Sequence, residues 1–103
     1  MKLGDDNNED VLRLRTMYRL LGSVPPTLRE VSVELKKTEI AFRCYFTDDA
    51  SEEDLELLGC AATELISDYP APFTLNDEYI KTPAPRPLNR LRHLVFARHE
   101  NAT

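Results

Sequence analysis

Apolar residues near the start of the chain recur with the period of a helix. Between residues 11 and 21 they stand three or four positions apart, and arginines take mainly the other positions, as in an amphipathic helix. The stripe consists of Val11, Leu14, Tyr18 and Leu21, with Met17 beside it. Gly22 and the pair Pro25–Pro26 end this segment, because proline removes a backbone donor. We therefore expect a helix that packs this stripe against the core.

After Leu28 the period of the apolar residues changes to two. Val31, Val33 and Leu35 alternate with polar residues, which predicts a strand with one buried face. A second alternating run, Ile40–Phe46, begins only a few residues later. This short spacing predicts an antiparallel hairpin.

A second helix begins at the strongest local signal in the chain. Ser51 and Asp54 have the spacing of a capping box, with Asp in place of the usual Glu or Gln. Acidic residues fill the first turn, where they complement the positive end of the helix dipole. The apolar stripe that follows is Leu55, Leu58, Ala62, Leu65 and Tyr69. Pro70 and Pro72 predict that the helix ends by Tyr69.

The last third of the chain predicts two further strands, at 73–80 and 94–97. The alternate prolines of 83–87 favour an extended connection between them. The order helix, strand, strand, helix, strand, strand predicts an α+β fold, in which an antiparallel four-stranded sheet carries two helices on one face. We expect a single domain over 1–103, with 1–9 as a flexible acidic arm. The strand at 73–80 is a candidate edge strand that pairs with a second copy or a partner.

Charge is unevenly distributed along the chain. There are 18 acidic and 13 basic residues, which give a net charge of -5. Residues 44–80 contain ten acidic residues and no Lys or Arg, whereas residues 81–99 contain five basic residues and no acid. A surface of this kind steers and orients a basic partner. The acidic balance argues against nucleic-acid binding, although Arg13, Arg15 and Arg19 form a possible basic stripe.

The acidic residues at the second helix have two interpretations. In the first they are helix-capping and solubility residues, partly neutralised by the arginines of the last strand. In the second they form a docking face for a basic protein, with carboxylates where phosphates would lie. A hydrolase pair or a divalent-cation site is a further alternative, but the calcium-loop spacing is absent from the sequence.

No other residues have the spacing of a catalytic or metal site. Cys44 and Cys60 stand among apolar residues and are predicted to be small core residues. His93 and His99, in or near the last strand, have no Cys or His at a ligand spacing. Glycine-rich phosphate loops and serine nucleophile elbows are absent from the sequence. We therefore predict a protein that is not an enzyme and uses no cofactor or metal.

The sequence predicts a cytoplasmic protein that does not insert into membranes. No apolar run approaches the ~20 residues of a membrane helix. The first fifteen residues contain four acids, Asp5, Asp6, Glu9 and Asp10, unlike a signal or transit peptide. Two cysteines are too few for a small secreted disulfide scaffold.

Four segments of the sequence resemble a known group of proteins. They are Val24–Val33, Phe42–Phe46, Ser51–Asp54 and Thr63–Pro70, a little under half of the chain. They are similar to small bacterial immunity proteins of contact-dependent growth inhibition and colicin-type systems. The resemblance implies an acidic cytoplasmic protein that neutralises a toxin domain, such as a basic nuclease, by binding it. Its oligomeric state is left open.

With this resemblance, the acidic residues become candidate toxin contacts. The candidate partner-binding residues are Asp48, Asp49, Glu52, Glu53, Asp54 and Glu56, with Tyr45 and Tyr69 as aromatic anchors. Two alternatives stay open at this point. One is a regulatory or adaptor domain that binds another cytosolic protein, and the other is a small carboxylate-dependent enzyme.

Overall fold

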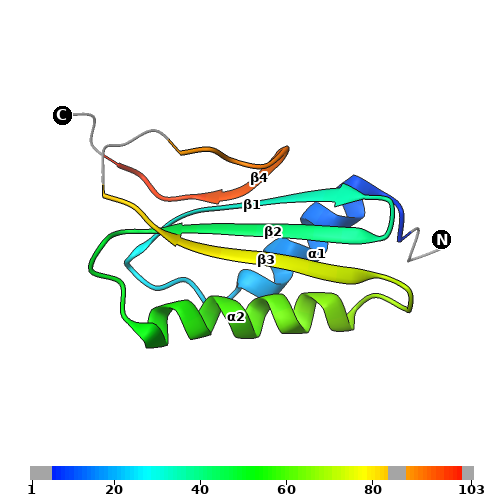
Figure 1. The fold of residues 1–103 in the computed structure, drawn as a ribbon, viewed down its shortest axis with the longest axis horizontal. Coiled ribbons are helices and arrows are strands. Elements are labelled where there is room, and N and C mark those ends of the chain that lie inside the picture. The colour runs from blue at the N-terminus through cyan, green and yellow to red at the C-terminus, as the bar shows by residue number, and fades with distance from the viewer. Residues whose placement is uncertain (1–5, 84–87, 101–103) are drawn as a thin grey trace.

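The computed structural model describes residues 6–83 and 88–100, which form an α+β fold (Figure 1). The elements are α1 (Glu9–Leu20), β1 (Leu28–Lys36), β2 (Glu39–Phe46), α2 (Glu52–Ser67), β3 (Thr74–Lys81) and β4 (His93–Ala97). Their order is the predicted one. The strands form one sheet in the order β3-β2-β1-β4. Helix α1 packs on β1 and β4, α2 packs on β2 and β3, and the two helices contact each other on one face of the sheet.

The prediction of an antiparallel sheet is wrong, because β3 runs parallel to β2. The strand β1 is antiparallel to both of its neighbours, β2 and β4, so the sheet is mixed. The cause is the length of α2. Its 16 residues span about 24 Å, close to the ~26 Å length of an eight-residue strand. The helix therefore returns the chain to the end where β2 began, and the next strand runs in the same direction as β2.

The predicted hairpin of β1 and β2 is confirmed. Its register places Val31 opposite Cys44 and Val33 opposite Phe42, so that apolar residues share one face. In the turn Lys37 has a φ of 57°, in the left-handed region that a connection of this length uses. The alternation of the sequence therefore identified both strands and their buried face.

The core lies between the helices and this face of the sheet. Its members include Leu12, Leu20, Val31, Val33, Ile40, Phe42, Cys44, Phe46, Leu58, Ala61, Ala62 and Leu65. The predicted capping box of α2 is present, since Ser51 and Asp54 each accept a backbone N–H bond from the other. Cys44 is buried as predicted, and burial raises the pKa of its thiol. Cys60 is exposed, so its prediction as a core residue is wrong.

Helix α1 turns a different face to the core from the one predicted. Leu12, Thr16 and Leu20 are buried, each four residues from the next. The predicted stripe instead faces solvent, with Leu14, Tyr18 and Leu21 exposed by 67%, 66% and 74%. Both rows have a helical period, so periodicity alone did not select between them. The buried hydroxyl of Thr16 is not left unpaired, because it donates a hydrogen bond to the Leu12 carbonyl at 2.7 Å.

This correction predicts opposite stabilities for two leucine variants. Leu12→Ala is expected to lower the free energy of unfolding by about 2–5 kcal/mol, because it leaves a cavity in the core. Leu14→Ala is expected to change it by less than about 0.5 kcal/mol, because the side chain is exposed. Urea denaturation of both variants measures the two values, and the reverse order would contradict the orientation of α1.

Residues 88–92 lie against the other face of the sheet. The Tyr45 hydroxyl donates to the Asn89 carbonyl and accepts from its N–H. The Leu91 N–H donates to the Ser32 hydroxyl at 2.9 Å. The Arg90 guanidinium donates to the carboxylate of Glu30, which is only 2% exposed, at 2.7 and 3.0 Å. This segment therefore supplies hydrogen-bond partners to Glu30, Ser32 and Tyr45.

Arg29 lies at a β-bulge in β1, and its side chain joins three distant parts of the chain by hydrogen bonds. The Arg29 guanidinium is buried and donates to the two Glu100 carboxylate oxygens at 2.7 and 2.9 Å. It also donates to the Thr82 carbonyl at 3.1 Å, directly after β3. Hydrogen bonds from Arg29 and Arg98 lower the pKa of Glu100 to about 2.

The lowered pKa of Glu100 predicts a loss of stability in acid. Its ordinary pKa is 4.5, so the stabilisation is complete above that pH and is lost as the pH falls toward about 2. The loss stays below about 3 kcal/mol, because the Glu100 side chain is 28% exposed and solvent screens its charge. Glu100→Gln should therefore make the free energy of unfolding less dependent on pH in this window. Urea titrations at several pH values measure this, and an unchanged pH dependence would contradict the assignment.

Candidate functional site

Five of the predicted contact acids are gathered on the surface at the start of α2. They are Asp48, Asp49, Glu52, Glu53 and Glu56, and we call them the acidic surface. Two of them belong to the turn after β2, and the other three belong to the first two turns of the helix. All five are exposed, and none forms an ion pair with a residue of 6–83 or 88–100.

The arginines of residues 88–100 have other partners. Arg90 pairs with Glu30, and Arg98 pairs with Glu100. Arg92 lies 3.8 Å from Glu9, at the start of α1. Within the described part of the chain, these arginines do not neutralise the acidic surface, which was one interpretation of the sequence. The acidic surface keeps its negative charge for interaction with solvent or with a partner.

Asp54 has a structural role in addition to its charge. Its carboxylate accepts a bond from the Thr27 hydroxyl at 2.8 Å and one from the Ser51 N–H at 3.2 Å. These bonds lower the pKa of Asp54, and the bond from Thr27 has the larger effect. Asp54 therefore joins the start of α2 to the loop before β1, and its replacement would change the fold as well as the surface.

The two tyrosines predicted as anchors lie inside the protein. Tyr45 is 7% exposed, and its hydroxyl is bound to residue Asn89. Tyr69 is 9% exposed, with the Arg15 guanidinium 4.5 Å above its ring and the Phe73 ring 5.0 Å away. Burial raises the pKa of the Tyr69 hydroxyl. Both rings are therefore placed to pack within the fold.

A second acidic feature, which sequence reasoning missed, lies between α2 and β3. It is a groove of about 630 Å³ lined by Glu56, Gly59, Cys60, Thr63, Glu64, Asp77 and Tyr79. The Tyr79 hydroxyl donates to the Asp77 carboxylate at 2.7 Å. Glu56 belongs to both the groove and the acidic surface, so the two are continuous. The sequence did not indicate this groove, because it does not show that β3 lies beside α2.

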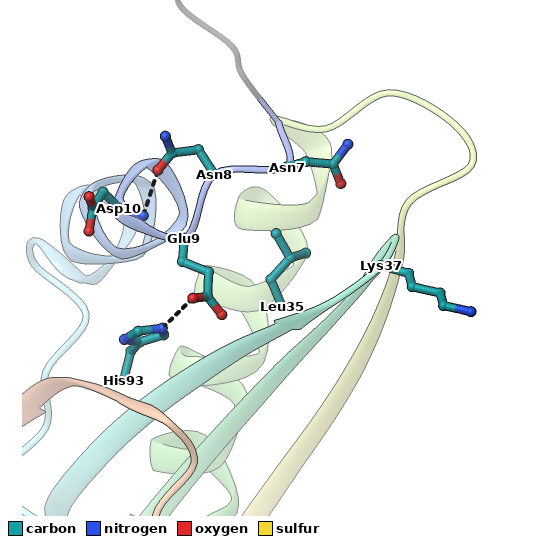
Figure 2. A pocket seen from close by; sticks show the side chains of 7 residues that line it. All are labelled: Asn7, Asn8, Glu9, Asp10, Leu35, Lys37 and His93. Atoms are coloured by element: carbon teal, nitrogen blue, oxygen red, sulfur yellow. Dashed lines mark hydrogen bonds and ion pairs between the residues drawn. The ribbon is translucent and has the colours of Figure 1, made fainter.

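A separate open pocket of about 600 Å³ lies at the start of α1 (Figure 2). Figure 2 shows Glu9 and His93 turned toward each other. The Glu9 carboxylate lies 3.1 Å from Nε2 of His93. Asn8 caps the helix by accepting bonds from the Asp10 and Val11 N–H groups. Lys37 points away from this pair. The polar groups of this pocket therefore serve the helix start and its link to β4.

Within 6–83 and 88–100 there is no group of three or more His, Cys, Asp or Glu placed to hold a metal ion. His93 lies in β4 and is half-buried, whereas His99 follows the strand and is exposed. Across the same residues, no helix combines the length and the apolar character needed to cross a membrane.

Comparison with protein families decides what kind of protein this is. The family model described as MafI2 immunity protein matches residues 9–100, from the first residue of α1 to the carboxylate that binds Arg29. The chain belongs to the MafI2 immunity protein family. The resemblance to small bacterial immunity proteins is thereby confirmed. A comparison with curated proteins gave no match.

Membership of the MafI2 immunity protein family gives the protein a role in neutralising a toxin. Immunity proteins in general act by binding the toxin rather than by catalysis. The matched residues include the acidic surface and the whole groove between α2 and β3. Both features therefore belong to the part of the chain that the MafI2 family shares.

Proposed function

We propose that this immunity protein neutralises its toxin by covering a basic surface of a nuclease domain with the acidic surface at the start of α2. The observation that carries the proposal is the separation of paired and unpaired charges. The five carboxylates of the acidic surface have no ion-pair partner among the described residues. The arginines of residues 88–100, which are Arg90, Arg92 and Arg98, pair with acids elsewhere in the fold.

The chemistry of a nuclease fits such a surface. A nuclease binds the phosphates of its substrate with lysines and arginines, which leave its active site positively charged. Carboxylates placed over these side chains occupy the positions of phosphates and exclude the substrate. The fields of the two surfaces also accelerate their encounter. Because such a toxin acts on nucleic acid inside the cell, we place the complex in the cytoplasm.

The proposed contact set follows the exposure of each candidate. The five residues of the acidic surface are included because their side chains are exposed, and only the Asp49 carboxylate among them accepts a bond from a described side chain, the Thr47 hydroxyl. Asp54 contributes charge, but its carboxylate is used by Thr27 and Ser51. Tyr45 and Tyr69 are not included, because they are 7% and 9% exposed.

The test is affinity capture with the purified protein from a lysate of its source cells, at low and at high salt. We expect a basic toxin domain to be retained at low salt, released at high salt and identified by mass spectrometry. Its nuclease activity should cease when one equivalent of the immunity protein is added. Retention of an acidic toxin, or retention that salt does not affect, would contradict the proposed surface. Retention of a protein without toxic activity would favour the regulatory or adaptor alternative.

A further inference from the structure

Among the described residues, no strand pairs with the outer edge of β3. The strand β3 is the last in the order β3-β2-β1-β4, so only β2 is hydrogen-bonded to it. Five of its eight residues are exposed. Helix α2 lies alongside β3 (Figure 1), and the groove between them is open to solvent. The edge is therefore accessible both to another backbone and to side chains.

The residues that present backbone groups at this edge can be identified. The N–H groups of Thr74 and Thr82 donate to β2 residues or their neighbours, Thr38 and Phe46. In a strand the backbone groups of successive residues point to opposite sides, so Asn76, Glu78 and Ile80 also face β2. The N–H and C=O groups that point outward are those of Leu75, Asp77, Tyr79 and Lys81. These are the groups that an added strand would bind.

The groove gives this edge a chemical preference. Side chains alternate between the two faces of a strand, and Asp77 and Tyr79 lie on the face that lines the groove with α2. Glu56, Glu64 and Asp77 bring three carboxylates to it, and none of the three has an ion-pair partner among residues 6–83 and 88–100. An added strand would direct every second side chain toward these carboxylates.

We propose that β3 binds an extended segment of the toxin as a fifth strand of the sheet, with lysine or arginine at alternate positions directed into the acidic groove. This inference rests on the proposed function and specifies how the toxin contacts the immunity protein. Backbone hydrogen bonds to Leu75, Asp77, Tyr79 and Lys81 supply affinity that is independent of sequence. The carboxylates of the groove select a basic segment. Because Glu56 is shared, the same toxin contacts the acidic surface and the edge together.

A second copy of the chain is a poorer occupant of this edge. Two β3 strands paired about a two-fold axis would bring the same acidic edge from each copy together. Asp77 and Glu78 of the two copies would then lie across one interface, and like charges opposite each other destabilise a strand pair. Charge complementarity therefore favours the basic toxin.

The decisive measurement is residue-resolved amide hydrogen exchange by NMR. The probe is the captured toxin domain in a catalytically inactive form, bound to the full immunity protein. We expect the amides of Leu75, Asp77, Tyr79 and Lys81 to exchange at least about tenfold more slowly in the complex. The amides of Asn76, Glu78 and Ile80, already bonded to β2, should change less. Slow exchange of the four outward amides in the free protein at high concentration would instead indicate a second copy and overturn the proposal.

Two variants of Asp77 separate the backbone contact from the charge. Asp77→Asn removes the charge but keeps the N–H, whereas Asp77→Pro also removes an outward N–H that β2 does not use. We expect the toxin affinity of the proline variant to be lower by about tenfold than that of the asparagine variant. Circular dichroism reports whether the proline variant is folded. If it is not, the exchange measurement on the unaltered chain decides.

The charge of the groove is tested with a matched pair. Glu64→Gln should weaken toxin binding at low salt, and Glu39→Gln, an exposed acid outside the groove, should not. If the toxin binds but the four outward amides exchange as in the free protein, the edge proposal is overturned and the acidic surface stands. If no toxin is captured, the proposed function fails and the edge proposal fails with it.

Discussion

Replacing Glu52 and Glu53 together with lysine is expected to slow association with the toxin by about 10- to 1000-fold at low salt. The two side chains are exposed at the start of α2 and have no partner among the described residues that would mask their charge. Their field extends into solvent and guides a basic surface toward the helix. At high salt this field is screened, so the variant and the unaltered protein should then associate with the toxin at similar rates. Stopped-flow or interferometry measurements of the association rate constant at several salt concentrations provide the test.

The control for this variant changes the same net charge at another place. Asp10 and Glu39 are also exposed acids, one in the first turn of α1 and one at the start of β2. Their joint replacement with lysine should slow association much less. If both pairs slow it equally, only the net charge of the protein matters and the acidic surface has no special role. Thermal unfolding of both variants shows whether the helix starts are intact.

Arg29→Met is expected to lower the free energy of unfolding by about 3 kcal/mol. The side chain is 3% exposed, and its removal leaves the Thr82 carbonyl and the Glu100 carboxylate without their buried donor. Arg98→Met is a matched control, because Arg98 binds the same carboxylate at 2.9 Å but is 30% exposed. Its loss should be below about 1 kcal/mol. Urea denaturation compares the two variants, and equal losses would show that burial of Arg29 adds nothing.

The sequence predicted those parts of the fold that depend on local interactions. The capping box of Ser51 and Asp54 and the hairpin of β1 and β2 were both identified, because neighbouring residues determine them. The prediction of which face of α1 is buried was wrong. The helix has two rows of apolar residues with a helical period, and only tertiary packing determines that the row of Leu12 and Leu20 is buried. The direction of β3 was wrong for a similar reason, since it depends on how far α2 carries the chain.

The candidate site was predictable only in part. The acids at the start of α2 were visible as a run in the sequence, but the sequence did not show that the described arginines pair with other residues and leave these acids unpaired. Pairs such as Glu30 with Arg90 join residues 60 positions apart, and no local pattern indicates them. The groove depends on Glu64 and Asp77 coming from different elements. Its identification needed the placement of β3 beside α2, which no local pattern gives.

The charged residues at the bulge in β1 help to fix the register of this strand against its neighbours. Arg29 and Glu30 are adjacent, oppositely charged and both buried, and each is met by a residue from the last part of the chain, Glu100 or Arg90. If β1 slipped by one residue against its neighbours, both charges would lose their partners in surroundings that exclude water. The two side chains therefore favour a single register of β1 against its neighbours. They exclude misaligned sheets that apolar residues alone would tolerate.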